Sequence, residues 1–221
     1  MGRGGGGGGG GVRWDRKNKM ANHYYTENPE LAHDLESWSF PLRGRTFQFT
    51  TDSGVFSRGT VDYGSRVLID AFEWENLPAG RLLDVGCGYG PIGLSLAAAT
   101  GRLVEMVDVN QRAVGLAQMN AQRNQITTVD IHSSNVYETL NETTYAAIVS
   151  NPPIRAGKKV VHGILTGAFP LLKVGGTLTV VIQKKQGAPS AEKKMAEVFG
   201  NVEIVTKDKG YYILRSVKEA E

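Results

Sequence analysis

From residue 62 onward, apolar β-prone runs alternate regularly with segments that have the spacing of amphipathic helices. We expect strands at 81–85, 103–109, 129–132, 145–150, 177–183, 202–206 and 211–217 and helices at 62–74, 91–99, 111–123, 160–172 and 190–199. Such alternation predicts an α/β fold, namely a doubly wound, mostly parallel seven-stranded sheet with helices on both faces. The turn at 207–210 is too short for a parallel crossover, so the last two strands should pair antiparallel and leave one strand reversed.

The part of the chain before this pattern divides into a leader and a small cap. Residues 4–11 are an unbroken glycine run, which cannot bury apolar surface and is costly to order. We therefore expect residues 1–19 to be a disordered, glycine-rich basic leader or tag, with Met20 as the natural start; a flexible RNA-binding arm is the alternative. Residues 20–61 should form an N-terminal cap in which a strand at 46–50 pairs with 38–42, followed by one domain at 62–221.

Composition excludes several function classes. The single cysteine, Cys87, rules out a disulfide framework and a cysteine-based zinc site, and we expect no metal site. No apolar run approaches the roughly 18 residues of a membrane span, and no apolar signal core is present, so we expect a cytoplasmic protein without membrane contact. Residues 1–19 carry a net charge of +4 and the remaining residues −1, so overall charge gives no argument for nucleic-acid binding.

The densest motif follows the strand expected at 81–85. There the chain enters a glycine-rich turn and then a helix, whose first N–H groups are available to a ligand. The spacing of Gly86, Gly88 and Gly90 differs from the G-x-G-x-x-G pattern of dinucleotide sites. Asp84, just before the glycines, would repel a pyrophosphate but can hold an ammonium directly or through water. The motif therefore favours a ligand with an amino-acid end over a dinucleotide.

Polar residues also end the next two strands. Asp108 lies about 20 residues beyond the glycines, where a carboxylate can accept hydrogen bonds from two ribose hydroxyls. Asn135 lies in the polar turn after the third strand and suits an adenine amine. Each piece alone has a structural explanation, as a glycine turn, a helix cap or a loop asparagine. Their order at successive strand ends instead matches S-adenosylmethionine, which has an amino acid, a ribose and an adenine.

The tetrapeptide Asn151-Pro152-Pro153-Ile154 ends the buried strand expected at 145–150. Two prolines stop the strand and fix the turn, because each ring locks φ and removes an N–H. The Asn151 carboxamide oxygen and the Pro152 carbonyl can both accept hydrogen bonds from one planar amino group. We interpret the tetrapeptide as a clamp for an –NH2 at the carboxyl edge of the sheet, with a tight turn that binds nothing as the alternative.

The order D-V-G-C-G-Y-G, D-V-N, S-N-V-Y, N-P-P-I resembles that of the class I S-adenosylmethionine-dependent methyltransferases, which have a Rossmann-like sheet. The N-P-P-x segment resembles the subset that methylates planar nitrogens, namely adenine N6, guanine N2 and the glutamine amide. Residues 54–65, the opening at 23–25, the strand at 47–49 and the tail at 183–187 resemble the short, single-domain members of the bacterial small-subunit ribosomal RNA guanine-N2 methyltransferases. The resemblance covers about residues 22–217.

This resemblance implies S-adenosylmethionine as the cofactor, a cap that folds over it, and a set of site residues. The implied cofactor-binding residues are Phe56, Asp62, Gly64, Ser65, Asp84, Gly86, Gly88, Asp108, Val109, Asn135, Val136 and Asn151. The implied catalytic residues are Asn151, Pro152, Pro153 and Ile154. Ile154 departs from the many N-P-P-x enzymes with an aromatic fourth residue; it can cover a base but lacks the stacking of about 1–3 kcal/mol per base.

Local basic residues suggest an RNA partner. Arg155, Lys158 and Lys159 adjoin the clamp, and Arg58 lies in the upstream loop; we expect them to contact ribosomal RNA or the small ribosomal subunit. The leading interpretation is methyl transfer to the exocyclic N2 of a guanine in 16S ribosomal RNA. Adenine N6 in RNA or DNA, a protein glutamine amide, a dinucleotide-dependent oxidoreductase and a cofactor-binding RNA chaperone stay open as alternatives. The sequence carries no signal for an oligomeric state.

Overall fold

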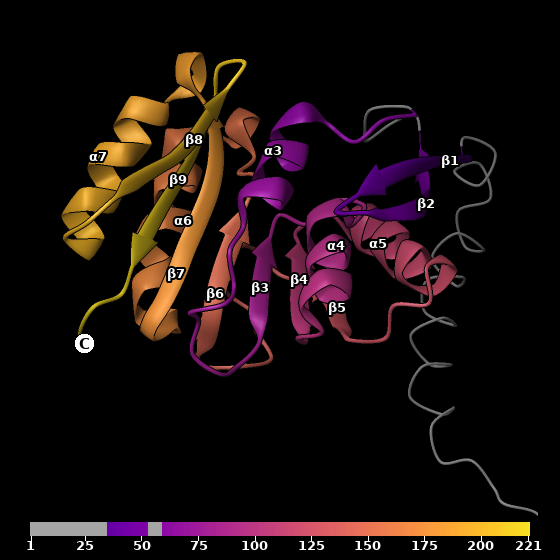
Figure 1. Cartoon of the computed structure of the whole chain (residues 1–221), viewed down its shortest axis with the longest axis horizontal. Coiled ribbons are helices and arrows are strands. Elements are labelled where there is room, and N and C mark those ends of the chain that lie inside the picture. The colour runs from indigo at the N-terminus through magenta and orange to yellow at the C-terminus, as the bar shows by residue number, and fades with distance from the viewer. Residues whose placement is uncertain (1–34, 53–58) are drawn as a thin grey trace, which may run out of the picture.

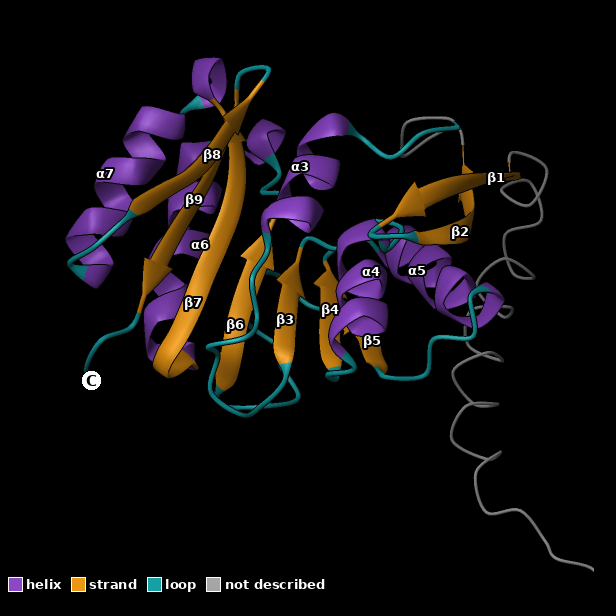
Figure 2. Ribbon diagram, viewed as in Figure 1, coloured by secondary structure: helices purple, strands orange, loops and turns teal. Residues whose placement is uncertain are grey.

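The computed structural model describes residues 35–52 and 59–221, which form a seven-stranded sheet, its covering helices and a separate hairpin (Figures 1 and 2). The sheet consists of β3 (Leu82–Val85), β4 (Val104–Asp108), β5 (Val129–Ser133), β6 (Tyr145–Ser150), β7 (Leu172–Gln183), β8 (Glu203–Asp208) and β9 (Tyr211–Val217). Their spatial order is β5-β4-β3-β6-β7-β9-β8. The predictions for residues 1–19, Met20, the opening at 23–25, Phe56 and Arg58 lie outside the described residues.

The sheet is parallel except for β9. Strands β3 to β7 pair with parallel neighbours, whereas β9 pairs antiparallel with both β7 and β8. The β8–β9 turn consists of Lys209 (φ 48°) and Gly210 (φ 82°), and two successive positive φ angles suit a tight hairpin. The predicted single reversed strand is confirmed, and it lies second from the edge because β8 adds to its outer side.

Helices cover both faces of the sheet (Figure 2). One layer contains α3 (Tyr63–Ala71), α4 (Pro91–Thr100) and α5 (Gln111–Arg123); the other contains α6 (Lys158–Leu171) and α7 (Ala188–Phe199). Successive strand residues point to opposite faces, so Leu82 is buried in the first layer and Leu83 in the second. This arrangement confirms the doubly wound fold.

The hairpin of β1 (Leu35–Leu42) and β2 (Arg45–Asp52) packs against α5 (Figure 1). Asn120 of α5 and Asn124, which caps the end of this helix, form hydrogen bonds with the backbone of β2. Asn120 both donates to and accepts from the backbone of Thr50, at 3.0 and 2.7 Å, and Asn124 does the same with Gln48 at 2.8 Å. These bonds satisfy buried backbone groups and fix the hairpin beside the sheet.

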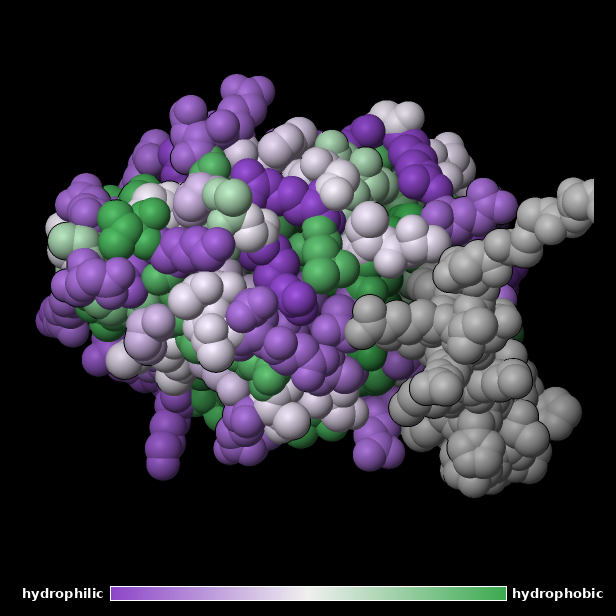
Figure 3. Space-filling view, turned by 90° about the horizontal axis from the view of Figure 1, so that it is seen from below, coloured by the Kyte–Doolittle hydropathy of each residue, from purple (hydrophilic) through white to green (hydrophobic). Residues whose placement is uncertain are grey.

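Figure 3 shows the molecule from the edge where the parallel strands of the sheet begin. At the edge where the parallel strands begin, hydrophilic residues are interspersed with hydrophobic ones over the visible surface (Figure 3). No helix in the described ranges is long and apolar enough to cross a membrane. The candidate site lies at the opposite edge, where these strands end.

Candidate functional site

A cavity of about 460 Å³ opens at the carboxyl ends of β3, β4, β5 and β6. Successive strands are added on one side of β3 up to β5 and on the other side from β6 onward, so the strand order reverses between β3 and β6. Ligands of open α/β sheets bind at such a topological switch point. The predicted site residues that line the cavity are Asp62, Ser65, Gly86, Gly88, Asp108, Val109, Asn135, Val136, Asn151 and Pro153. Segments far apart in the sequence therefore meet around one space.

The glycine turn forms the floor of this cavity. Gly86, Gly88 and Gly90 have φ angles of 73°, 57° and 105°, a region that side chains with a Cβ rarely adopt. Asp108 holds the turn in place, because its Oδ2 accepts the Gly88 N–H at 2.9 Å. Burial raises the pKa of the Cys87 thiol within the turn, so this cysteine stays protonated and packs as a small apolar residue.

Asp84 lies behind the turn, between β3 and α4. It is fully buried, and its Oδ2 accepts the Gly93 N–H at 2.9 Å, whereas Oδ1 accepts no hydrogen bond from the part of the chain that is described. Burial raises the pKa of Asp84 to about 7, and the nearby charge of Asp108 adds to this. Asp84 does not line the cavity. Of the two predicted ways to hold an ammonium, directly or through a water molecule, its position is therefore compatible with the second.

The turn after β5 brings a strained residue to the cavity. Val136 has a φ of 55°, which is a true outlier for a β-branched side chain. Ser134 holds this conformation, since its hydroxyl donates to the Val136 carbonyl at 2.8 Å and accepts the Thr139 N–H at 3.0 Å. Strain of this kind costs about 1–3 kcal/mol and concentrates at ligand sites. The exposed Asn135 lies beside it on the cavity wall.

The Asn151 carboxamide has a defined orientation. Its Nδ2 lies 3.0 Å from Asp62 Oδ2 and 3.0 Å from Ser65 Oγ. A carboxylate can only accept, so the amide NH2 must face Asp62 and the oxygen must face away. No group in the described ranges donates to this oxygen. Asp62 also caps α3, accepting the Ser65 N–H at 3.1 Å, so the start of one helix aims the clamp residue.

The turn after Asn151 leaves one particular carbonyl free. The Pro153 carbonyl accepts the Ala156 N–H at 2.9 Å, and the Ile154 carbonyl accepts the Gly157 N–H at 3.1 Å. These bonds form the short 3₁₀ helix η1 (Ile154–Ala156). Within the described residues, no donor reaches the carbonyl of the buried Pro152. The turn therefore presents two acceptors, the Asn151 side-chain oxygen and the Pro152 carbonyl.

Four of the predicted cofactor-binding and catalytic residues in the described ranges do not line the cavity, namely Gly64, Asp84, Pro152 and Ile154. Gly64 faces the Tyr211 ring, and a Cβ at this position would come within 2.8 Å of Tyr211 Cε1, so close packing accounts for the glycine. Ile154 packs against the core between the sheet and the α6–α7 layer. Ile154 therefore does not line the cofactor cavity, and its predicted role as a cover for the base stays a prediction.

Sequence reasoning missed part of the apolar wall. Val160 and Ile164 line the cavity from α6, together with Ile92 from α4. Residues four apart share a helix face, so the Val160–Ile164 spacing directly after the clamp was the available signal. Tyr89, in the glycine turn, also lines the cavity and contacts Trp38 and Phe49 of the hairpin.

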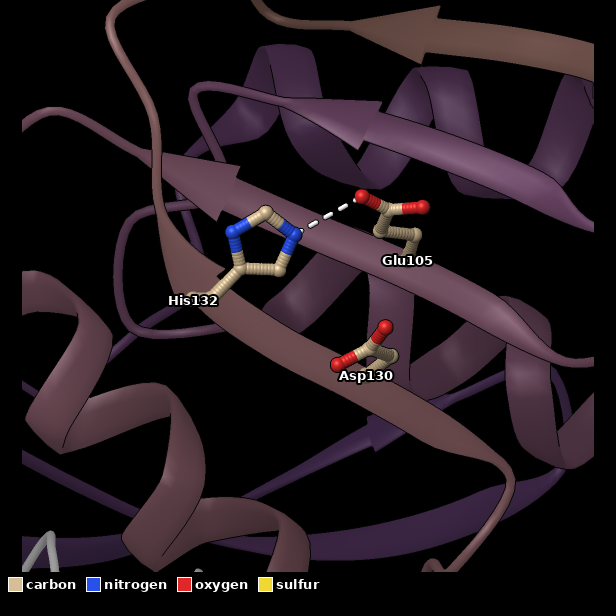
Figure 4. Close-up of side chains that lie close together, drawn as sticks. All are labelled: Glu105, Asp130 and His132. Atoms are coloured by element: carbon tan, nitrogen blue, oxygen red, sulfur yellow. Dashed lines mark hydrogen bonds and ion pairs between the residues drawn. The ribbon is translucent and has the colours of Figure 1, made fainter. Parts of the chain in front are cut away.

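Glu105, Asp130 and His132 are the one group of potential metal ligands among the described residues (Figure 4). Glu105 is fully buried, and Oε1 accepts from the Arg81 guanidinium at 3.3 Å and from a tyrosine hydroxyl at 2.8 Å. Oε2 lies 2.7 Å from His132 Nε2 and accepts a backbone N–H at 2.8 Å. Arg81 also pairs with Asp130, so this cluster ties the sheet together near its amino edge, away from the cavity.

Comparison with known proteins identifies the family. A family model described as "Methyltransferase small domain" matches residues 46–215, well over half of the chain. The chain belongs to the methyltransferase small domain family. The protein is similar to a solved structure described as "T. Thermophilus 16S rRNA N2 G1207 methyltransferase (RsmC) in complex with AdoMet and Guanosine". The TM-score is 0.74 and the sequence identity is 27%. The match covers 83% of this chain and 50% of that one.

Relatives of this methyltransferase small domain protein differ in length. It is 53% identical to the YbxB protein of Bacillus subtilis (strain 168), over 90% of this chain and 100% of that protein. It is 30% identical to the Ribosomal RNA small subunit methyltransferase C of Erwinia tasmaniensis, over 81% of this chain and 51% of that protein. It is 28% identical to the Ribosomal RNA large subunit methyltransferase G of Aeromonas hydrophila subsp. hydrophila, over 87% of this chain and 51% of that protein. The chain thus spans about half the length of these two ribosomal RNA methyltransferases.

These findings confirm several predictions. The fold class, the family and S-adenosylmethionine as the cofactor are as the sequence motifs indicated, and the protein is an S-adenosylmethionine-dependent methyltransferase. Membership of this family also contradicts the alternative of a dinucleotide-dependent oxidoreductase.

Proposed function

We propose that this methyltransferase modifies the exocyclic N2 of a guanine in small-subunit ribosomal RNA. The observation that carries the proposal is a pair of acceptors directly after β6 that are unoccupied within the described residues, the oxygen of the cavity-lining Asn151 and the adjacent Pro152 carbonyl. A planar –NH2 has two hydrogens and can donate one to each acceptor. The similarity to a 16S ribosomal RNA N2 methyltransferase solved with AdoMet and guanosine supports guanine N2 over adenine N6 or a glutamine amide.

The residues around the cavity fit the cofactor. We assign the unpaired, buried Oδ1 of Asp84 to its amino group through water, the Asp108 carboxylate to its ribose and Asn135 to its adenine. At the start of α4 the Ile92 N–H adds one donor beside the glycine turn, since Pro91 has no N–H and the Gly93 N–H bonds to Asp84. When bound, S-adenosylmethionine supplies an electrophilic methyl group on a sulfonium.

The chain's own contribution to the chemistry is positioning. The exocyclic nitrogen of guanine is conjugated with its ring and is a poor nucleophile. Hydrogen bonds from this amine to Asn151 Oδ1 and to the Pro152 carbonyl draw the nitrogen lone pair out of conjugation and fix its direction. The nitrogen becomes strongly acidic as its new bond forms and releases its extra proton to water, so these neutral acceptors suffice and no strong base is needed.

Basic residues beside the clamp supply the RNA contact in this proposal. Arg155, Lys158 and Lys159 are all exposed, and none forms an ion pair with another described residue. They follow the clamp directly, on the rim where substrate must arrive. Lysine and arginine contacts to phosphate give affinity that falls with salt. Ribosomal RNA or the small ribosomal subunit in the bacterial cytoplasm is the partner we propose.

Labelled S-adenosylmethionine tests the proposal directly. The protein would be incubated with naked ribosomal RNA, with small subunits, with large subunits and with mature ribosomes, and the labelled nucleotide would be mapped. We expect label on N2 of a guanine in small-subunit RNA. Label on adenine, on large-subunit RNA or on a protein would show that the target differs from the one proposed. Absence of label from all of these substrates would defeat the proposal.

Replacement of Asn151 by Ala tests the clamp. We expect the rate of methyl transfer to fall at least about 100-fold, because the variant loses an oriented acceptor that acts on the reacting amine. Calorimetric titration should show a cofactor Kd within about threefold of the original. Asp70→Asn, at an exposed acid on α3, serves as the matched control and should leave both quantities unchanged. Equal losses of turnover and cofactor binding would contradict the role given to Asn151.

A further inference from the structure

A second cavity, of about 230 Å³, lies on the other side of the η1–α6 segment. Its lining consists of Ile154, Lys158, Val161, His162, Ile182, Gln186, Gly187 and Ser190. The cofactor cavity is lined from the same segment by Ala156, Val160 and Ile164, so the two spaces share a wall but no lining residue. Both open at the carboxyl edge of the sheet, since Ile182 is near the end of β7.

The lining of the second cavity suits a flat heteroaromatic ring. Val161 and Ile182 are buried and, with Ile154, give an apolar surface. His162 and Ser190 add polar edges and lie 3.2 Å apart, from Nε2 to Oγ. Burial, with Lys158 and Lys194 nearby, lowers the pKa of His162, so the ring is neutral and carries one donor and one acceptor. The volume is below the roughly 300–1,000 Å³ of drug-sized sites and fits one ring system.

The rim of this cavity favours a negative group attached to that ring. Helices α6 and α7 both start here, at Gly157 and Gly187, and neither has a capping side chain or an acidic residue in its first turn. Their free N–H groups and partial positive charges attract anions. Lys158 belongs to the lining, and Lys184 and Lys185 are exposed on the adjacent turn. A nucleotide combines these two features, a flat heteroaromatic base and a phosphate.

The clamp and the second cavity are formed by different residues. Asn151 and Pro153 line the cofactor cavity and not the second one, so the amine held by Asn151 belongs to the first site. We propose that the second cavity binds the base of a nucleotide next to the target in a single-stranded RNA segment. The RNA then crosses η1, where Arg155 is exposed. This inference rests on the proposed function and makes α6 and α7 determinants of sequence context.

Two variants and a matched control test the inference. Ser190→Met fills the cavity, and Gln186→Ala removes an exposed polar contact; Lys193→Ala, at an exposed position on α7, is the control. We expect Ser190→Met and Gln186→Ala to raise KM for an RNA oligonucleotide containing the target guanine about tenfold, because the first blocks the cavity and the second removes a polar partner of the base. The kcat, the KM for free guanosine and the cofactor Kd should stay within twofold of the original, and Lys193→Ala should change none of them.

Binding gives a second readout that needs no turnover. The oligonucleotide would carry the fluorescent base 2-aminopurine beside the target position, and its emission would be followed on titration with the protein. We expect the emission to change with the original chain and to stay constant with Ser190→Met. If Ser190→Met folds poorly, the comparison is made with Gln186→Ala, for which we expect a smaller change in emission than with the original chain. An unchanged oligonucleotide KM in both variants, or an equal rise in the guanosine KM, would overturn the inference. Absence of methyl transfer by the original chain would instead defeat the proposed function.

Discussion

At the scale of single residues, the site depends on a few polar atoms with defined partners. Asp108 uses one oxygen to hold the glycine turn, and Asp84 keeps one oxygen unpaired in the core. An unpaired buried acceptor costs free energy in the cofactor-free protein. Such a cost is sustained where a ligand later satisfies the group, which is the role we propose for Asp84.

Replacement of Asp84 by Asn should change how stability depends on pH. Burial raises the pKa of Asp84 to about 7, above the value of about 4 in unfolded chains. Between these values the folded state keeps a proton that the unfolded state has lost, so stability falls as pH rises from about 4 to about 7. Asp84→Asn abolishes this loss, and we expect it to stabilise the cofactor-free protein by up to about 4 kcal/mol at pH 8 and little at pH 4.

Urea unfolding of both proteins at pH 4 and pH 8 would measure this difference. The exposed Asp70 again supplies a control, since Asp70→Asn should leave the pH profile unaltered. If Asp84→Asn gave the same change in stability at both pH values, the buried carboxyl would not be protonated as its surroundings indicate.

At the scale of elements, the site depends on contacts between segments that the chain order keeps apart. The start of α3 reaches the end of β6 through Asp62 and Asn151, which are 89 residues apart in sequence. In α4, Gly93 lets the helix approach β4 closely, because a Cβ there would come within 2.6 Å of Met106. The helix N-terminus beside the glycine turn is therefore held by packing against the neighbouring strand.

Replacement of Asp62 by Ser separates the two roles of this residue. Serine is a good N-cap and can still accept the Ser65 N–H, but it is too short to replace the contact with Asn151. We expect the free energy of unfolding to stay within about 0.5 kcal/mol, and kcat to fall about 10- to 100-fold, as for a lost hydrogen bond to a charged group. Asp62→Ala, which removes the cap as well, should additionally destabilise the fold by about 1 kcal/mol.

Denaturant unfolding and steady-state kinetics on the same preparations would test these expectations. A kcat for Asp62→Ser close to that of the original chain would show that Asn151 is oriented without α3. If kcat fell only in proportion to the loss of stability in Asp62→Ser and Asp62→Ala, the role of Asp62 would be structural alone.

At the scale of the whole molecule, local signals predicted the fold well. The helix expected at 111–123 has the same bounds as α5, and Asn110 caps it with two hydrogen bonds, which is a local signal. By contrast, β7 begins at Leu172, five residues before the strand expected at 177–183, and it includes Gly175 and Gly176. Gly176 lets β7 pass close to the Ala146 carbonyl, a contact between distant segments that local sequence does not encode.

The site shows the same division between local and distant signals. Asp108, Asn135 and Asn151 were found because each follows a strand, and the carboxyl ends of parallel strands meet at one edge. The orientation of Asn151 by Asp62 could not be found, because it depends on where α3 packs. Likewise, the direction of the Ile154 side chain depends on the path of η1 across the core.

The cofactor cavity joins four strand ends and the start of α3, so cofactor binding should stabilise the whole domain and not one loop. A ligand that binds only the folded state adds about 2.7 kcal/mol at 100 times its Kd. For a domain of this size, about 2–4 °C per kcal/mol makes that a rise of roughly 5–10 °C in Tm. Differential scanning calorimetry should show one transition that shifts as a unit, and by less in Asp108→Ala, whose carboxylate supports the glycine turn. Two transitions, of which only one moved with S-adenosylmethionine, would show instead that the cavity belongs to a subdomain that unfolds separately.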